Sequence, residues 1–103
     1  MEENDKYQLI AMNIIASSGE TRSLAFEALR EAREGNFDKA EEYVKQADEA
    51  ILQAHKAQMD LLVDEANGTK ADLSILLIHS QDHFMTSMLA LDLVKEMIEM
   101  LKK

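Results

Sequence analysis

Apolar residues recur at the spacing of helical turns along most of the chain, and two short polar breaks interrupt them. The breaks are REGNFD at 33 to 38 and ANGTKAD at 66 to 72, and each contains a glycine. No segment alternates between apolar and polar residues as a half-buried strand would. The pattern therefore predicts three helices, at about 4 to 34, 36 to 66 and 70 to 102.

Both breaks contain residues that commonly end one helix and begin the next. Gly35 and Gly68 fit the left-handed conformation that closes a helix at its C-terminus. Asn36 fits the N-cap of the second helix, and Thr69 or Asp72 fits that of the third, because their short side chains accept hydrogen bonds from free backbone N–H groups. The two breaks are thus predicted to be short turns between helices.

Short turns between helices of similar length favour neighbours that run in opposite directions. Residues 1–103 are therefore predicted to form one all-α domain, an antiparallel up-down-up three-helix bundle. The absence of proline from the sequence suits long helices. Gly19, in ASSGETRS, is the weak point of the first helix. We expect the helix to continue through it, because a helical glycine costs only about 1 kcal/mol. A break there, giving four helices, is the alternative.

The third predicted helix is apolar on nearly every side. In a three-helix bundle each helix keeps one face that its two neighbours leave bare, so this helix needs further cover. We expect that cover to come from other copies of the chain, in a homotrimer with the third helices near the threefold axis. The apolar residues concerned are Leu73, Ile75, Leu76, Leu77, Ile78, Phe84, Met85, Met88, Leu89, Leu91, Leu93, Val94, Met97, Ile98, Met100 and Leu101.

The net charge of −9, from 20 acidic and 11 basic residues, makes the chain strongly acidic. That balance argues against nucleic acid and anionic membrane surfaces as partners and favours a basic protein partner. The N-terminal MEENDKYQLI is acidic where a secretory signal would be basic, and no apolar run reaches the ~18 residues of a membrane span. Without cysteine, disulfides and thiolate chemistry are excluded. We expect a soluble, intracellular protein.

Polar residues interrupt the third helix at the segment HSQDHF. His79, Asp82, His83 and Thr86 are separated by three or four residues, which places them on one side of a helix, whereas Gln81 projects away from them. Each buried polar group without a partner costs about 1 to 3 kcal/mol. Some interaction with this side of the helix is therefore expected.

The residues alone leave three interpretations of these histidines open. They could be satisfied by hydrogen bonds and serve packing, as we expect for His55 in QAHKAQ. They could hold a metal ion, although HSQDH lacks the glutamate of the metalloprotease motif. Alternatively, His79 could accept a transferred group as a nucleophile, with its neighbours orienting it. A thin bundle has no deep cavity, so such chemistry would occur at the surface against a partner, which favours a carrier over a self-contained enzyme.

The segment LLIHSQDHFMTS resembles the phosphorylation-site helix of the lactose/cellobiose-type enzyme IIA proteins of the bacterial sugar phosphotransferase system. ASSGETRSLAFEAL, EGNFDKAEEYV and AHKAQMDLL also occur in that family's order and spacing, and the H-x-Q-D-H-x-M core is specific to it. The resemblance spans the chain. It implies a cytoplasmic three-helix protomer that assembles as a homotrimer, and a phosphotransferase component that acts through a phosphohistidine intermediate.

The resemblance also implies a role for each polar residue of this helix. His79 would accept a phosphoryl group from the general phosphocarrier protein and pass it to a cysteine of the cognate IIB component during uptake of a β-linked disaccharide. Asp82 of each chain would face the threefold axis and share one divalent cation per trimer, expected to be Mg²⁺. His83 and Gln81 would help to hold the phosphoryl oxygens. The residues do not separate lactose from cellobiose or chitobiose.

A function of another class fits part of the sequence. EGNFDKAEEYVKQADEAI resembles a fragment of small three-helix adaptor domains or of a tetratricopeptide unit. The alternative is therefore a non-catalytic interaction module that binds a partner helix in a groove. No period of about 34 residues recurs, which argues against a repeat array. Such a module would not need His79, Asp82 and His83 in register on one side of a helix.

Overall fold

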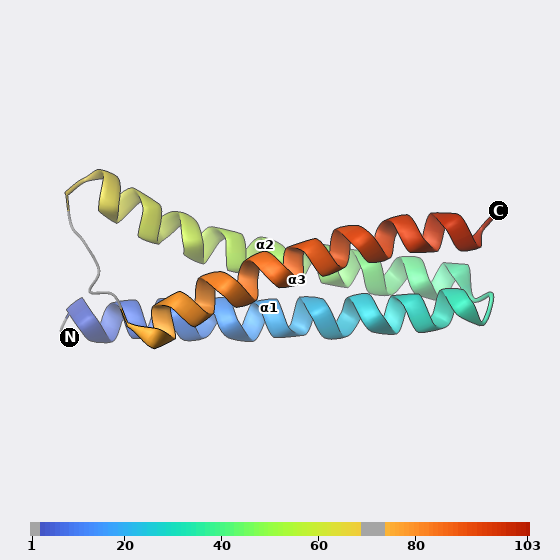
Figure 1. The fold of residues 1–103 in the computed structure, drawn as a ribbon, viewed down its shortest axis with the longest axis horizontal. Helices are drawn as coiled ribbons and strands as arrows, with labels where there is room; N and C mark the ends of the chain where they lie inside the picture. The colour runs from blue at the N-terminus through green and yellow to red at the C-terminus, as the bar shows by residue number, and fades with distance from the viewer. Residues whose placement is uncertain (1–2, 69–73) are drawn as a thin grey trace.

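The computed structural model of the chain describes residues 3–68 and 74–103. These residues form three α-helices and no strand: α1 is Glu3–Arg33, α2 is Phe37–Ala66 and α3 is Ile75–Leu101. Figure 1 shows the helices lying along the long axis of an elongated particle of 51 × 21 × 19 Å. The prediction of an all-helical chain with three helices is confirmed.

A left-handed glycine forms the turn between α1 and α2, as predicted. Gly35 has a φ of +83°. Its N–H donates to the Ala32 carbonyl at 3.0 Å, and the Asn36 N–H donates to the Glu31 carbonyl at 2.9 Å, which satisfies carbonyls at the end of α1. Asn36 precedes α2 as expected, but its side chain does not cap that helix. Its amide Nδ2 donates to the Glu31 carboxylate instead, at 2.9 Å.

The end of α2 is closed in a similar way. The Asn67 N–H donates to the Val63 carbonyl at 3.0 Å, and the Gly68 N–H donates to the Glu65 carbonyl at 3.1 Å. Gly68 has a φ of +89°. Glycine therefore supplies the left-handed residue after both α1 and α2, and both positions were predicted.

The start of α3 differs from the prediction. Thr69 and Asp72, the expected N-caps, lie outside the described residues. α3 begins at Ile75, later than predicted, because Ser74 has an extended backbone and accepts a hydrogen bond from the Leu77 N–H at its Oγ, 3.0 Å away. This serine satisfies one of the backbone donors that a helix start leaves free.

α1 continues through Gly19 without interruption, so the four-helix alternative is wrong. α3 lies close to α1 at this point. A Cβ built at Gly19 would stand 3.5 Å from Nε2 of His83. That separation is an ordinary van der Waals contact. Gly19 therefore marks the place where α1 approaches the polar segment of α3.

Alanines supply most of the core surface of α1 and α2. α2 buries a regularly spaced row of them: Ala40, Ala47, Ala50, Ala54 and Ala57. α1 buries Ala11, Ala25, Ala28 and Ala32. Side chains this small let helix axes approach closely. Larger residues of α3 complete the core, in one cluster with Leu91, Val94 and Ile98 and in another with Phe84.

Polar contacts join α1 and α2 near the start of the chain. Lys6 Nζ and Tyr7 Oη both donate to Oδ2 of Asp64, at 3.0 and 3.1 Å. The hydrogen bond from Lys6 is the main reason that the pKa of the Asp64 carboxyl is lowered. The start of α1 therefore lies beside the end of α2. Exposed pairs of this kind add little stability, so the buried apolar core carries most of the packing energy.

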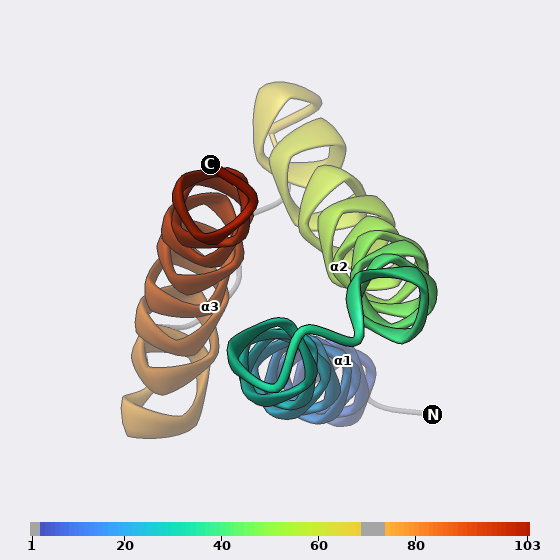
Figure 2. The same cartoon turned by 90° about the vertical axis from the view of Figure 1, so that its right-hand side faces the viewer.

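α3 packs mainly on α1 and touches α2 less. Figures 1 and 2 both show the end of α2 and the start of α3 diverging from one another. α3 also leaves a large apolar surface exposed, as predicted from its sequence: Ile75, Ile78, Met85, Leu89, Leu93, Met97, Met100 and Leu101. Within residues 3–68 and 74–103, no helix has the length and apolarity needed to cross a membrane.

Alanine substitutions at two glycines should have opposite effects on stability. We expect Gly19→Ala to raise the free energy of unfolding by roughly 0.5 to 1 kcal/mol, because alanine favours a helix interior more than glycine does. Gly35→Ala should lower it by about 1 to 2 kcal/mol, because the positive φ strains any residue with a Cβ. Urea denaturation followed by circular dichroism, at one protein concentration, measures both. A loss of stability in Gly19→Ala would contradict the ordinary contact at His83.

Candidate functional site

His79 and His83 form the centre of the predicted site. They lie one turn apart on α3, and their imidazole rings stack with centroids 5.6 Å apart and planes inclined by 21°. His79 is exposed, whereas His83 is partly buried. The prediction that the two histidines share one side of the helix is confirmed. One imidazole is therefore open to a partner, and the second supports it from the next turn.

His83 is held in its neutral form. Its pKa is lowered from the ordinary value of 6.5, chiefly by burial, and further by the positive charge of Arg22 and by His79, while Asp82 acts in the opposite direction. The burial arises where α1 passes His83 at Gly19. A neutral imidazole has one N–H donor and one acceptor nitrogen, so His83 can donate to an oxygen without adding charge to the site.

Asp82 is exposed, and its carboxylate has no hydrogen bond or ion pair with another described residue. Thr86, one turn later, uses its hydroxyl on the backbone: Oγ1 donates to the Asp82 carbonyl at 2.9 Å and lies 3.3 Å from the His83 carbonyl. The hydroxyl proton of Thr86 is therefore already engaged, and the Asp82 carboxylate is available for another contact.

One chain does not assemble a metal centre from the residues that the structure describes. No group of three or more His, Cys, Asp or Glu side chains lies close enough to hold an ion in residues 3–68 and 74–103. Asp82 instead stands among exposed apolar residues of the same helical face, namely Ile78, Met85 and Leu89, which are 57%, 51% and 58% exposed. A carboxylate in this setting fits a divalent cation only if further oxygen ligands come from outside the chain.

Gln81 is directed towards α2 and away from His79. Its Oε1 accepts a hydrogen bond from Nε2 of Gln58 at 2.8 Å, and its own Nε2 lies 3.4 Å from Oγ of Ser80. Ser80 is buried and donates to the Leu77 carbonyl at 2.6 Å. Each residue of an α-helix is rotated by about 100° from the last, so Gln81 points to a different side from His79. Its predicted contribution to phosphoryl binding stays a prediction.

His55 serves packing on α2. Its ring stacks on Phe84 of α3, with centroids 6.3 Å apart and planes inclined by 28°. His55 makes no hydrogen bond to another residue in the described parts of the chain, so the predicted hydrogen bond is wrong. The packing interpretation holds, but the contact is between rings.

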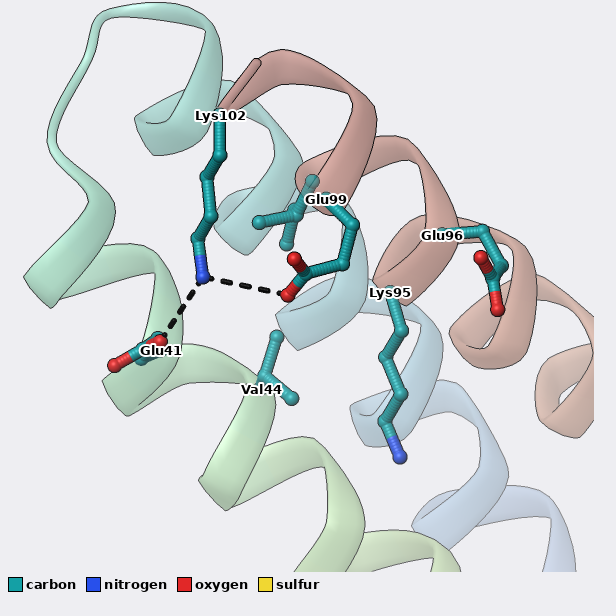
Figure 3. Close-up of a pocket in the computed structure, with 7 residues that line it drawn as sticks. Glu41, Val44, Lys95, Glu96, Glu99 and Lys102 are labelled. Atoms are coloured by element: carbon teal, nitrogen blue, oxygen red, sulfur yellow. Dashed lines mark hydrogen bonds and ion pairs between the residues drawn. The ribbon is translucent and has the colours of Figure 1, made fainter.

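A groove between α2 and α3 lies at the other end of the bundle from the histidines. Figure 3 shows Lys102 reaching both Glu41 and Glu99, at 3.1 and 3.4 Å. The hydrogen bonds to Glu41 and then to Glu99 raise the pKa of Lys102. The groove is roughly 35 Å from His79 at the helical rise per residue. Its lining has three carboxylates and two ammonium groups, and it contains none of the predicted site residues.

Arg22 is a site residue that the sequence analysis missed. It lies on α1 three residues after Gly19, and so on the same side of that helix. Its guanidinium acts electrostatically on His83 and forms no ion pair with another described residue. The spacing of Gly19 and Arg22 in GETR places both on one side of α1. It indicates that Arg22 is near the histidines only once α1 is known to cross α3 at Gly19.

Comparisons with known proteins agree on one family. The family described as "PTS system, Lactose/Cellobiose specific IIA subunit" matches residues 9–102. The lactose-specific EIIA component of the PTS system of Staphylococcus epidermidis is 48% identical over 99 residues, which cover 96% of this chain and 95% of that protein.

Solved structures give the same result. The crystal structure of PtcA from S. mutans has a TM-score of 0.94 and 40% identity over 100% of both chains. A solution structure of the IIA(Chitobiose)-HPr complex of the Escherichia coli phosphotransferase system has a TM-score of 0.79 and 38% identity, covering 99% of this chain and 96% of that one. Likeness of sequence and likeness of fold thus extend over the same residues.

The lowered pKa of His83 predicts a measurable pH dependence. We expect the His83 ring to titrate below the ordinary value of 6.5 in the folded protein. The unfolded chain then binds this proton more readily, so the contribution of His83 to stability is complete above about pH 6.5 and declines as the pH falls through the lowered folded-state pKa. NMR titration of the imidazole protons measures the midpoint, and His83→Gln both identifies the signal and removes this part of the pH dependence. A midpoint at or above 6.5 would contradict the burial.

Proposed function

This chain belongs to the lactose/cellobiose-specific IIA family of the sugar phosphotransferase system, and from that premise we propose that His79 is the residue that carries its phosphoryl group. Members of this family are phosphotransferase components of sugar transport that act through a phosphohistidine intermediate. The observation that carries the proposal is the exposure of His79 beside a neutral, stacked His83.

The chemistry needs an accessible nitrogen lone pair and little else from the chain. The lone pair of the neutral His79 imidazole attacks phosphorus as the bond from phosphorus to the donor atom breaks, and the electron pair of that bond stays with the donor. The N–H proton on the other nitrogen of His79 leaves to solvent. The donor atom that released phosphorus takes up a proton from solvent. His83 donates an N–H to a phosphoryl oxygen. Passing the group on reverses these changes.

Two protein partners follow from this role. Solved structures of IIA(Chitobiose) in complex with HPr support HPr, the general phosphocarrier protein, as the donor to His79. The acceptor is a cysteine of the cognate IIB component, during uptake of a β-linked disaccharide. The net charge of −9 would steer a basic face of the donor towards this chain at a rate that falls with added salt. The family match favours this function over the non-catalytic interaction module.

The exposed face of α3 supports assembly with other copies. We propose that the chain is an up-down-up protomer and that three copies pack their α3 helices near a threefold axis. Ile78, Met85 and Leu89 lie on one face and are all more than half exposed in the single chain. Contact between copies would remove this apolar surface from water, at roughly 25 cal/mol for each Å² buried.

Asp82 lies on the same apolar face, and this gives it a role in the trimer. Three such carboxylates near one axis would repel one another strongly in a dry interface. A shared divalent cation, expected to be Mg²⁺, would offset that repulsion and be held by the oxygen ligands that it prefers. The other copies would supply the ligands that a single chain lacks, which is consistent with the absence of a metal cluster in the described part of one chain.

Removing the His79 imidazole should abolish phosphoryl uptake. We expect His79→Ala to reduce radioactive phosphate transferred from phosphorylated HPr to background, because the exposed nucleophile is lost while the core is untouched. His55→Gln is the matched control, since that exposed histidine lies on α2 and should leave uptake unchanged. The measurement is phosphate bound per chain at completion. Uptake by His79→Ala at the wild-type level would overturn the assignment.

The shared cation should couple assembly to Asp82. Light scattering with Mg²⁺ present should report three times the chain mass of 11.7 kDa. A chelator should weaken this assembly in the wild type but not in Asp82→Asn, whose neutral amides do not repel, while Asp60→Asn, an exposed carboxylate change on α2, should keep the sensitivity. A monomer at micromolar concentration would contradict the trimer. A trimer indifferent to chelator would contradict the shared cation alone.

A further inference from the structure

We propose that Arg22 of α1 binds the phosphoryl group once it is on His79, and that its guanidinium positions the group during transfer. This inference rests on the proposed function of His79. It adds a residue from another helix to a site that is otherwise built on α3 alone.

The crossing of α1 and α3 places Arg22 beside the histidines. Gly19 is in van der Waals range of the His83 ring, with a Cβ position 3.5 Å from Nε2. Arg22 follows one turn later on the same side of α1, and helical side chains lean back towards the N-terminus of their own helix. The guanidinium is thereby directed towards the level of His83. The rings of His83 and His79 stack at 5.6 Å, and we infer from this that the same arginine side chain reaches a group on His79.

Arg22 is also free to bind. Several basic side chains of the chain are engaged in ion pairs, such as Arg30 with Glu27, Lys95 with Asp48 and Lys102 with Glu41. Arg22 is exposed and makes no ion pair with another described residue.

The charge of the transferred group favours a cation beside the site. A phosphoryl group brings about two negative charges at neutral pH. The receiving protein already has a net charge of −9, and Asp82 lies one turn from His79. His83 offers an N–H donor for a phosphoryl oxygen. A guanidinium offers a planar fork of donors that matches two phosphoryl oxygens and keeps its charge at every working pH.

The test compares Arg22→Gln, Arg22→Lys and Arg33→Gln with the wild type. Arg33 is the matched control because it lies on α1 without an ion pair to a described residue, roughly 16 Å further along the helix. Transfer of radioactive phosphate from phosphorylated HPr is followed over a range of HPr concentrations, which separates kcat from KM. The fraction of chains phosphorylated at equilibrium is measured in the same samples.

We expect Arg22→Gln to lower kcat and the phosphorylation equilibrium constant by roughly ten- to a hundredfold, the range for a lost hydrogen bond to a charged group. KM should change little, since loss of a positive charge does not weaken attraction to a basic donor. Arg22→Lys should recover part of the loss, because the charge remains while the fork is lost. Arg33→Gln should match the wild type. Circular dichroism confirms that each variant is folded.

The outcomes separate this inference from the proposed function. If the wild type accepts phosphate and Arg22→Gln equals it in kcat and equilibrium, Arg22 does not hold the phosphoryl group. An effect on KM alone would assign Arg22 to docking and would also overturn the inference. If the wild type itself accepts no phosphate, or accepts it without His79, the proposed function fails whatever Arg22 does.

Discussion

The close approach of α1 to α3 at Gly19 and His83 determines how far each histidine is buried. It is possible because small residues line the two helices there. Ser18 and Ser87 are buried, and their hydroxyls have no hydrogen-bond partner among the described residues, so they act here as small side chains. This packing buries one imidazole enough to keep it neutral and leaves the other in solvent. Side chains larger than alanine at Gly19 would extend into the His83 ring, hold α3 further away and change both properties.

α3 has three distinct sides: a core face, an exposed apolar face and a polar side with the histidines. Phe84, Leu91 and Ile98 pack into the core, and the opposite face presents Ile78 and Leu89 to solvent. The histidines stand between these two faces. A group carrier needs this arrangement, because a phosphoryl group enclosed in a cavity could not be handed from one large partner to another. In the proposed function, the partner would supply the rest of the enclosure, so an open site needs no deep pocket.

Local features of the sequence were predictable, whereas contacts between helices were not. Gly35 and Gly68 could be predicted because a left-handed turn has a chemical requirement that the sequence displays. The pairing of His79 with His83 could be predicted because it depends only on the helical repeat. The bond from Gln58 to Gln81 and the place of Arg22 could not, since both depend on which turn of one helix lies beside which turn of another. Periodicity defines the face of a helix but not the axial offset of its neighbour.

The start of α3 shows a different limit. ANGTKADLS contains several residues able to cap a helix, and each would give an acceptable first turn by itself. In the structure the N-cap of α3 is Ser74, the last of these residues. The apolar residues that follow it form the first turns of the helix. A choice among equivalent local caps is made by tertiary packing, which the sequence pattern does not contain.

The central position of α1 has a consequence for the order in which the molecule forms. α1 contacts both other helices, while α2 and α3 contact one another sparingly. As the chain leaves the ribosome, α1 and α2 emerge first and can pair through their alanines before α3 has emerged. His79 and His83 thus join the bundle after α1 and α2, on a helix that docks against a surface already formed. The helix that carries the proposed site and the exposed apolar face is therefore the last of the three to join the bundle.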